Sequence, residues 1–226
     1  MKQSLRCYML FDGDLMMIAS NLVQTITRDS VEFATYSVDV AAITAFAALG
    51  NQFKTFPPDI FYQADVGIAT EEKNAAREQL LIETRKITNR ALVKWGKNSS
   101  HYKKFDVKRI TEMSDKTLLA TARLVVKTAE ELLAELSSEG LTQDIIDDYI
   151  IYTQNFEDKL NALNSAIEIR DTKSKERIAL GNQLYTLVSK YCLLGKTIWN
   201  KVDESKYNDY IIYGKPSKGK IDVPND

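Results

Sequence analysis

Long stretches of this chain carry apolar residues at helical spacing, and this pattern constrains the fold more than any other feature. Between positions 142 and 167 the apolar residues recur every three or four positions, which places them on one face of a helix. They are Ile145, Tyr149, Tyr152, Phe156, Leu160, Leu163 and Ile167. Similar patterns cover 13–28, 37–51, 70–95, 115–138 and 175–199. We therefore predict an all-α fold of about six helices.

Few residues interrupt these patterns, because the chain has only 4 Pro and 9 Gly in 226 residues. Gly96 and Gly140 follow two of the patterns, and Gly140 is suited to a left-handed helix end. The predicted architecture is an elongated, mostly antiparallel helical bundle. Segments 5–11, 101–110 and 206–213 lack the pattern and are predicted as short extended arms. The tail 214–226 is predicted to be flexible or docked on a partner.

Two parts of the sequence resemble each other. When 71–95 is placed over 175–199, Trp95 meets Trp199 and Leu80 meets Leu184. Thr70 and Ser174 precede these stretches as predicted N-caps, and Ser37–Val40 falls on Thr142–Ile145 in the same way. We interpret the chain, 1–226, as a single domain of two tandem three-helix repeats, about 12–110 and 114–213. Six helices without common ancestry are the alternative.

Composition restricts the class of protein. The chain carries 30 Lys+Arg against 31 Asp+Glu, and the net charge of −1 argues against a bulk nucleic-acid binder. It has no apolar run long enough to span a membrane and no signal-peptide core, so we expect no membrane insertion and a cytoplasmic location. Cys7 and Cys192 form no disulfide framework, and Cys192 is predicted to be a core residue.

The sequence offers little catalytic chemistry. His101 is the only histidine, so a histidine-based metal site cannot form, and no nucleophile signature accompanies it. Neither a phosphate-binding loop nor a dinucleotide fingerprint occurs. Adjacent carboxylates, such as Glu130 and Glu131, fall mostly on the polar faces of their helices. We expect no enzyme activity, no metal and no cofactor, although a ligand pocket between the repeats stays an open hypothesis.

Charge is unevenly distributed along the chain. Positions 85–127 are strongly basic, and positions 127–160 are strongly acidic. Three interpretations compete: the charges cancel within one molecule, the basic region of one copy meets the acidic region of the next, or the segment 94–109 binds nucleic acid or another anionic partner. Lysines interleaved with aromatic residues suit single-stranded nucleic acid, which supports the last interpretation.

We predict a structural or interaction protein that assembles head-to-tail into a homo-oligomer or filament. Tyrosine is enriched at interfaces, and several of the 11 Tyr lie near the end of the chain. The candidate interface residues are Trp95, Lys97, Tyr102, Lys103, Lys104, Phe105, Asp144, Asp147, Asp148, Tyr207, Tyr210 and Tyr213. A nucleic-acid-binding or anion-binding module is the alternative function.

Overall fold

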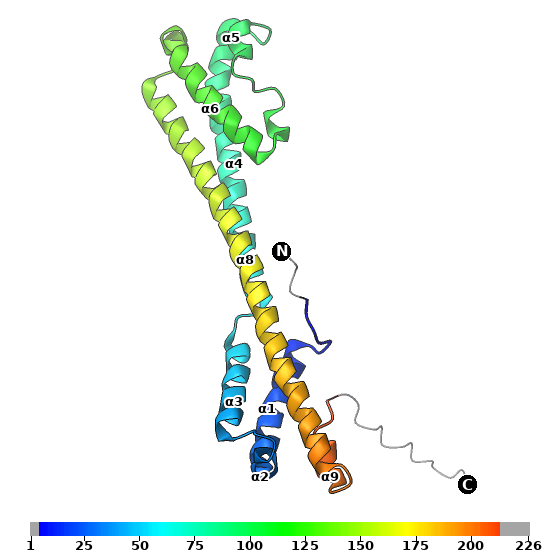
Figure 1. Cartoon of the computed structure of the whole chain (residues 1–226). Helices are drawn as coiled ribbons and strands as arrows, with labels where there is room; N and C mark the ends of the chain where they lie inside the picture. The colour runs from blue at the N-terminus through cyan, green and yellow to red at the C-terminus, as the bar shows by residue number, and fades with distance from the viewer. Residues whose placement is uncertain (1–4, 213–226) are drawn as a thin grey trace, which may run out of the picture. The chain divides into compact units, whose positions relative to one another are not determined.

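The structure is a computed structural model that describes residues 5–212, and every regular element in this range is a helix (Figure 1). The all-α prediction is therefore confirmed for the described residues. The predicted arm 5–11 contains no helix. The other two predicted arms are wrong, because 101–110 and 206–213 contribute to short helices: α5 (Ser100–Lys103), the 3-10 helix η1 (Ile110–Glu112) and α9 (Glu204–Asn208). The predicted tail and Tyr213 lie outside the described residues.

The chain forms two compact units. Within the described residues, unit 1 comprises 5–58 with 172–212, and unit 2 comprises 59–171. Their boundaries differ from the predicted repeat ranges 12–110 and 114–213. The single domain, the bundle arrangement and the tandem repeat therefore stay predictions.

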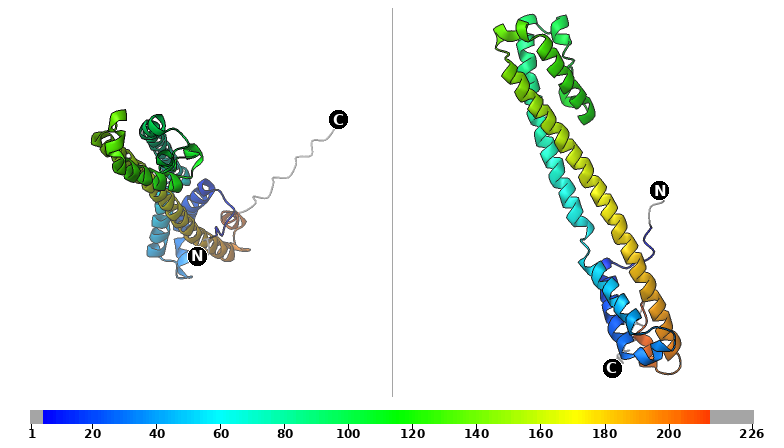
Figure 2. Two further views of the ribbon diagram at one scale, coloured as in Figure 1. Left: turned by 90° about the horizontal axis from the view of Figure 1, so that it is seen from above. Right: turned by 60° about the vertical axis from the view of Figure 1, so that its left-hand side comes forward.

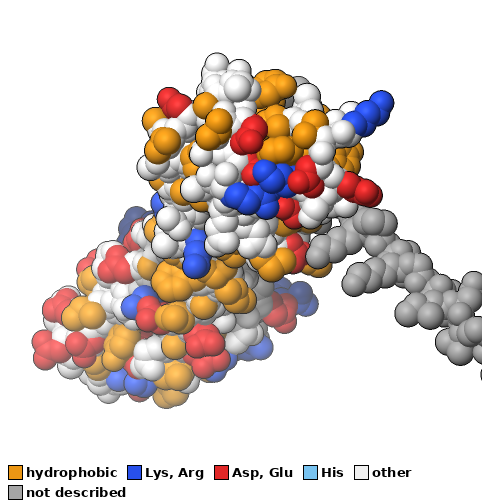
Figure 3. Space-filling view, turned by 90° about the horizontal axis from the view of Figure 1, so that it is seen from below, with side chains coloured by type: hydrophobic (Ala, Val, Ile, Leu, Met, Phe, Trp, Pro, Cys, Tyr) orange, Lys and Arg blue, Asp and Glu red, His pale blue; other side chains and the backbone are white. Residues whose placement is uncertain are grey.

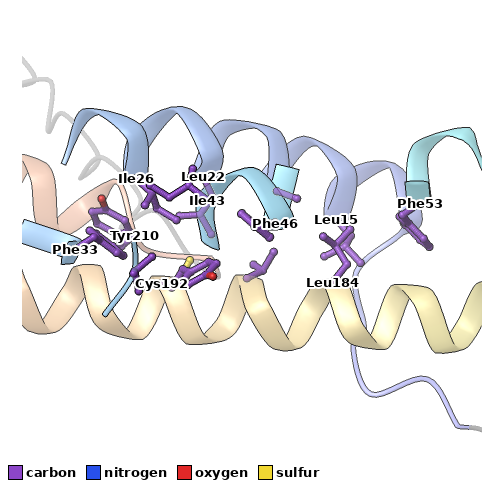
Figure 4. Packing of buried hydrophobic residues seen from close by; sticks show 14 of the residues in the cluster. Leu15, Leu22, Ile26, Phe33, Ile43, Phe46, Phe53, Leu184, Cys192 and Tyr210 are labelled. Carbon is purple, nitrogen blue, oxygen red and sulfur yellow. The ribbon is translucent and has the colours of Figure 1, made fainter. Parts of the chain in front are cut away.

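Unit 1 contains α1 (Asp12–Arg28), α2 (Ser30–Ala34), α3 (Val40–Thr55), the second part of α8 (Gln143–Trp199) and α9. The helices α1 and α3 lie side by side, and both pack against α8 (Figures 1 and 4). Figure 4 shows Leu15, Phe46 and Leu184 meeting in this core. Contacts from Asp12 to Arg177 and from Asp29 to Trp199 make α1 parallel to α8.

Unit 2 contains α4 (Asp59–Trp95), α5, η1, α6 (Asp115–Glu131), α7 (Leu133–Leu136), the 3-10 helix η2 (Ser137–Glu139) and the first part of α8. Figures 1 and 2 show α4 alongside this part of α8. Two contacts, Thr84 with Tyr149 and Glu72 with Lys159, make these two helices antiparallel. Leu80, Leu118 and Phe156 are among the fully buried residues of its core.

Two predicted helix starts are wrong. Helix α4 begins at Asp59, immediately after Pro57 and Pro58, and Thr70 lies inside it, where its hydroxyl donates to the carbonyl of Val66 at 2.7 Å. Ser174 lies inside α8, which runs without a break for 57 residues. The stretch 167–174 contains neither glycine nor proline, so nothing there interrupts the helix.

A third predicted start, Ser37, lies two residues before the actual cap: Asp39 caps α3 and accepts from the backbone N–H of Ala42, at 2.8 Å. Two other helix ends follow the sequence. Thr142 accepts from the N–H of Ile145, at 3.4 Å, at the start of α8. Gly140 has a φ of 77°, the left-handed conformation expected for it.

Candidate functional site

The basic and acidic regions of unit 2 form two ion pairs and further hydrogen bonds with each other. Lys104 pairs with Glu131, and this hydrogen bond holds the pKa of Glu131 below its usual value. Arg123 donates twice to Glu157, at 2.7 Å each. The ammonium of Lys94 reaches the carbonyl of Glu135 and the hydroxyl of Ser138, at 2.7 Å for the latter. Part of the charge segregation is therefore balanced within one copy.

The aromatic residues assigned to an interface have different environments. Phe105 and Tyr210 are fully buried in their own units, which corrects their assignment as surface contacts. Trp95 and Tyr102 are half-buried, and Trp95 stacks on His101 with ring centroids 4.6 Å apart. Tyr207 is half-buried against the core of unit 1. Aromatic residues at helical spacing suit a core as well as a surface, and these rings pack within the molecule.

The charged members of the predicted interface are exposed, as a surface role requires. They are Lys97, Lys103, Lys104, Asp144, Asp147 and Asp148. Asp147 accepts a hydrogen bond from Gln143 at 2.8 Å. The structure places the acidic residues on the first turns of α8 and the lysines around α5, all within unit 2.

A buried carboxylate organises the end of unit 1. Asp29 is fully buried between α1 and α2, and it accepts from the indole N–H of Trp199 (3.0 Å), the hydroxyl of Tyr210 (2.8 Å) and the guanidinium of Arg28 (2.8 Å). The ammonium of Lys206 lies 3.3 Å from the same carboxylate. Burial alone would raise the pKa of Asp29, but these hydrogen bonds outweigh it and lower the pKa to about 2.

The same cluster fastens α9 to the rest of unit 1. Burial and the neighbouring carboxylate of Asp29 raise the pKa of Tyr210, which therefore stays a neutral donor. The ammonium of Lys206 lies 3.8 Å from the centroid of the Trp199 ring. The polar groups around the Asp29 carboxylate all bind to it or to each other. The cluster therefore stabilises the fold and presents no reactive group.

A second polar cluster lies at the other end of unit 1. Arg177 is buried, pairs with Asp12 at 2.8 Å and donates to the carbonyl of Phe56 at 2.7 Å. Its guanidinium also lies over the ring of Phe53, 4.8 Å from the centroid. One side chain thus ties α8 to the start of α1 and to the end of α3.

A groove between α1 and α3 is the most distinctive surface of unit 1. It has a volume of about 580 Å³ and is lined by Met16, Met17, Ala19, Ser20, Asn21, Val23, Gln24, Phe46, Ala47, Gly50, Asn51 and Lys54. Met17 is 59% exposed, and Val40, one turn before Thr44 on α3, is 74% exposed. Figure 3, viewed from the end where α2 and α9 lie, shows further hydrophobic side chains at the surface of unit 1. Lys54 is the only charged residue of the lining.

Sequence reasoning missed this groove, although a signal for it exists. No acidic or basic residue occurs from Leu15 to Thr27 or from Val40 to Phe53, while charged residues make up 27% of the whole chain. A helix that is uncharged all round is typical of a buried helix. In α1 and α3, however, the residues that face away from the core are exposed.

The described residues contain no group of three or more His, Cys, Asp or Glu side chains arranged to hold a metal ion. Within 5–212, no helix combines the length and apolar composition that crossing a bilayer requires. Comparisons with family models, curated proteins and solved structures gave no match to this chain.

Proposed function

We propose that this protein is a non-enzymatic interaction protein that associates with further copies of itself, and that the groove between α1 and α3 is the contact surface. The observation that carries the proposal is the open groove between two stretches, 15–27 and 40–53, that contain no charged residue. Exposed apolar surface bordered by polar residues is a feature of protein–protein contacts. A second helix lying in the groove would cover Met17 and the exposed side of α3.

Unit 2 offers an internal comparison for this surface. Its helix α6 and the start of α8 bury residues 103 positions after those of α1 and α3, as in Leu118 after Leu15 and Ile146 after Ile43. At this spacing, the counterparts of Ser20 and Lys54 are Arg123 and Glu157, which form an ion pair. Unit 2 thus has a salt bridge at the positions where unit 1 has a groove, which supports a separate role for the groove.

The exposed side of α3 favours another α3 as the occupant. Val40, Thr44, Ala47, Asn51 and Lys54 are spaced by four and three residues, the arrangement of a seam between paired helices. The small side chain of Ala47 at its centre allows a close approach. If two α3 helices ran antiparallel about a two-fold axis at Ala47, Thr44 would lie beside Gly50 and Asn51 of the other copy.

Charge supports the same arrangement. Asp39 stands at the start of α3 and Lys54 near its end, and both are exposed. The described residues provide no ion pair for Lys54. Antiparallel pairing brings Asp39 of each copy close to Lys54 of the other, so a second copy supplies the complementary charge at both ends.

Assembly through the basic and acidic regions of unit 2 is a second mode of the same function. Lys97 and Lys103 are exposed, as are Asp144 and Asp148, and this favours it. The ion pairs of Lys104 and Arg123 within unit 2 reduce the charge available for it. The nucleic-acid alternative is weaker, since Phe105 is buried and Trp95 already stacks on His101.

The groove is tested by particle mass against concentration, measured by light scattering or sedimentation. We expect dimers of the wild-type chain that dissociate on dilution. Ala47→Glu should weaken the dimer at least tenfold, because it places two like charges at the axis. The matched control is Ala48→Glu, which adds the same charge to the neighbouring exposed residue outside the groove and should leave the dimer intact. Monomers at every concentration would overturn the proposal.

The antiparallel register is tested by disulfide formation. In a Cys7→Ser background, Ala47→Cys should give a covalent dimer under mild oxidation, and Ala48→Cys should react more slowly. Equal rates for the two variants, with dimers still present, would contradict the register and leave the self-association in place. Lys103→Glu distinguishes assembly through the charged regions of unit 2, because this substitution should not affect a dimer formed through α3.

A further inference from the structure

The buried positions of the two units recur at a nearly constant spacing in the sequence. In the first two long helices of each unit the spacing is 103, and in the third it is 104. Corresponding buried pairs are Leu15 and Leu118, Ala19 and Ala122, Ile43 and Ile146, Phe53 and Phe156, Leu80 and Leu184, and Phe105 and Tyr210 (the last pair, after the third helices, at 105). A shared apolar pattern alone would favour this agreement, so polar contacts give a stronger comparison.

Several polar contacts also recur. Asp12 pairs with Arg177 at 2.8 Å in unit 1, and Asp115 pairs with Lys73 at 2.8 Å in unit 2. These pairs join corresponding positions, since Asp115 lies 103 residues after Asp12 and Arg177 lies 104 after Lys73. Both fix the start of the first helix to the third helix. A contact of this kind does not follow from helical periodicity.

Backbone details at the helix ends agree as well. Ser99 caps α5 and accepts from the N–H three residues later, and Asp203, 104 residues further, caps α9 in the same way. The N–H of Val38 donates to the carbonyl of Phe33 at 3.2 Å, and the N–H of Leu141 donates to that of Leu136 at 3.1 Å. The local chain path before the second long helix is therefore the same in both units.

The third helices, however, are exchanged. Unit 1 combines α1 and α3 with residues 172–199, although the helix that follows α3 in the chain is α4. Unit 2 combines α6 and the first part of α8 with α4. Each unit thus takes its first two helices from one half of the chain and its third from the other half.

The continuity of α8 explains this exchange. A third helix that packs on its own first two helices needs a turn after the second one. The stretch 167–174 forms no turn and stays helical, so residues 172–199 cannot fold back against α6 and the start of α8. Helix α4 fills that place instead, and residues 172–199 are left to complete unit 1.

We propose that the chain is a tandem repeat of one three-helix unit with exchanged third helices, and that residues 172–212 of a second copy can complete unit 1 in place of the chain's own. The contacts of Arg177, Trp199 and Tyr210 would be the same in either case, so only the connecting segments change. Exchange of an identical element is a low-cost route to association. If each copy gives its residues 172–212 to the next copy, the assembly is head-to-tail. One end then has an unused 172–212 segment, and the other end has an α1–α3 pair without its third helix. This inference does not depend on the groove.

Complementation between two full-length variants tests the proposal. One carries Leu184→Asp, which damages the third helix of unit 1, and the other carries Leu15→Asp, which damages the first. Both carry Trp95→Phe, so that Trp199 is the only fluorophore of its kind. Each variant alone should have an exposed Trp199. Mixing should give a 1:1 heterodimer with a buried Trp199, since the intact α1 of one copy meets the intact 172–212 of the other.

A control pair and a second measurement complete the test. Leu184→Asp mixed with Val188→Asp should not complement, because both damage the same helix. Two differently tagged wild-type chains, unfolded together and refolded at rising concentration, should give mixed dimers that increase with concentration and persist on dilution. Failure of the first pair to form a heterodimer, together with the absence of mixed dimers after refolding, would overturn the proposal. Ala47→Glu in the tagged chains should not affect these dimers, which separates them from dimers formed through the groove.

Discussion

The indole N–H of Trp199 donates a hydrogen bond of 3.0 Å to the buried carboxylate of Asp29, 170 positions away in the sequence. This bond joins the end of α8 to the turn between α1 and α2. The two tryptophans are therefore not equivalent in their surroundings. Trp199 is 7% exposed, while Trp95 is half-buried and stacks on His101.

Substitution of the tryptophans should reveal this difference. Trp199→Ala should lower the free energy of unfolding by about 3–5 kcal/mol, because it creates a cavity and removes a donor from a buried carboxylate. Trp95→Ala should cost clearly less, since part of its ring is already in water. Urea denaturation of the two variants measures both values. A larger loss for Trp95 would contradict the environments described for the two rings.

Acid should act on unit 1 through Asp29. Its pKa is lowered from 3.8 to about 2 in the folded chain. A carboxylate with a depressed pKa contributes stability above its unfolded pKa, and this contribution, of about 2 kcal/mol, is lost as pH falls from about 4 towards 2. Asp29→Asn should remove that part of the pH dependence. Tyr210→Phe should reduce it, because Tyr210 is one of the donors that lower the pKa. The free energy of unfolding, measured from about pH 4 to pH 2, tests this. If it depends on pH as steeply in Asp29→Asn as in the wild type, the Asp29 carboxylate is not the cause.

Glycine substitutions test the fit of Tyr210 against α8. A Cβ at Gly195 would lie 2.3 Å from the ring of Tyr210, so Gly195→Ala should displace the ring and lower stability by about 1–3 kcal/mol. Gly67, inside α4, has no neighbour within 4 Å of such a Cβ. Gly67→Ala should therefore raise stability by about 0.5–1 kcal/mol through helix propensity. Thermal unfolding followed by circular dichroism distinguishes the two, and opposite signs are the expected result.

Two arginines provide a contrast between buried and exposed ion pairs. Arg177→Met removes the buried guanidinium from Asp12, which keeps only its contacts with Arg6 and Tyr8, and takes this donor from the carbonyl of Phe56. It should cost about 3 kcal/mol or more. Arg123→Met removes an exposed pair with Glu157 and should cost at most about 1 kcal/mol. Denaturation with guanidinium chloride measures both. Similar losses would show that burial of Arg177 contributes little.

The sequence predicted the helices better than it predicted their partners. The apolar spacing around Leu15, Leu118 and Leu184 predicted the buried faces of those three helices correctly, since periodicity is a local property. The grouping of 172–199 with α1 and α3, and of α4 with α6, is not local, because it depends on contacts between residues far apart in the sequence. The aromatic signal at Phe105 and Tyr210 was assigned to a surface, although both rings lie in cores. Asp29 gave no signal at all, because its partners Trp199 and Tyr210 are distant in the sequence.

The division of unit 1 into two distant segments has a consequence for synthesis. Residues 59–171 form one continuous segment, so unit 2 can be complete as soon as it leaves the ribosome. Helices α1 and α3 are made earlier, yet Leu15, Phe46 and Phe53 gain their partners on α8 only after residue 172 has been added. At translation rates of about 5–20 residues per second, synthesis of the segment from residue 58 to residue 172 takes roughly 6–23 s. During that time the apolar faces of α1 and α3 lack the part of α8 that buries them. We therefore expect nascent chains to depend on chaperones at this stage.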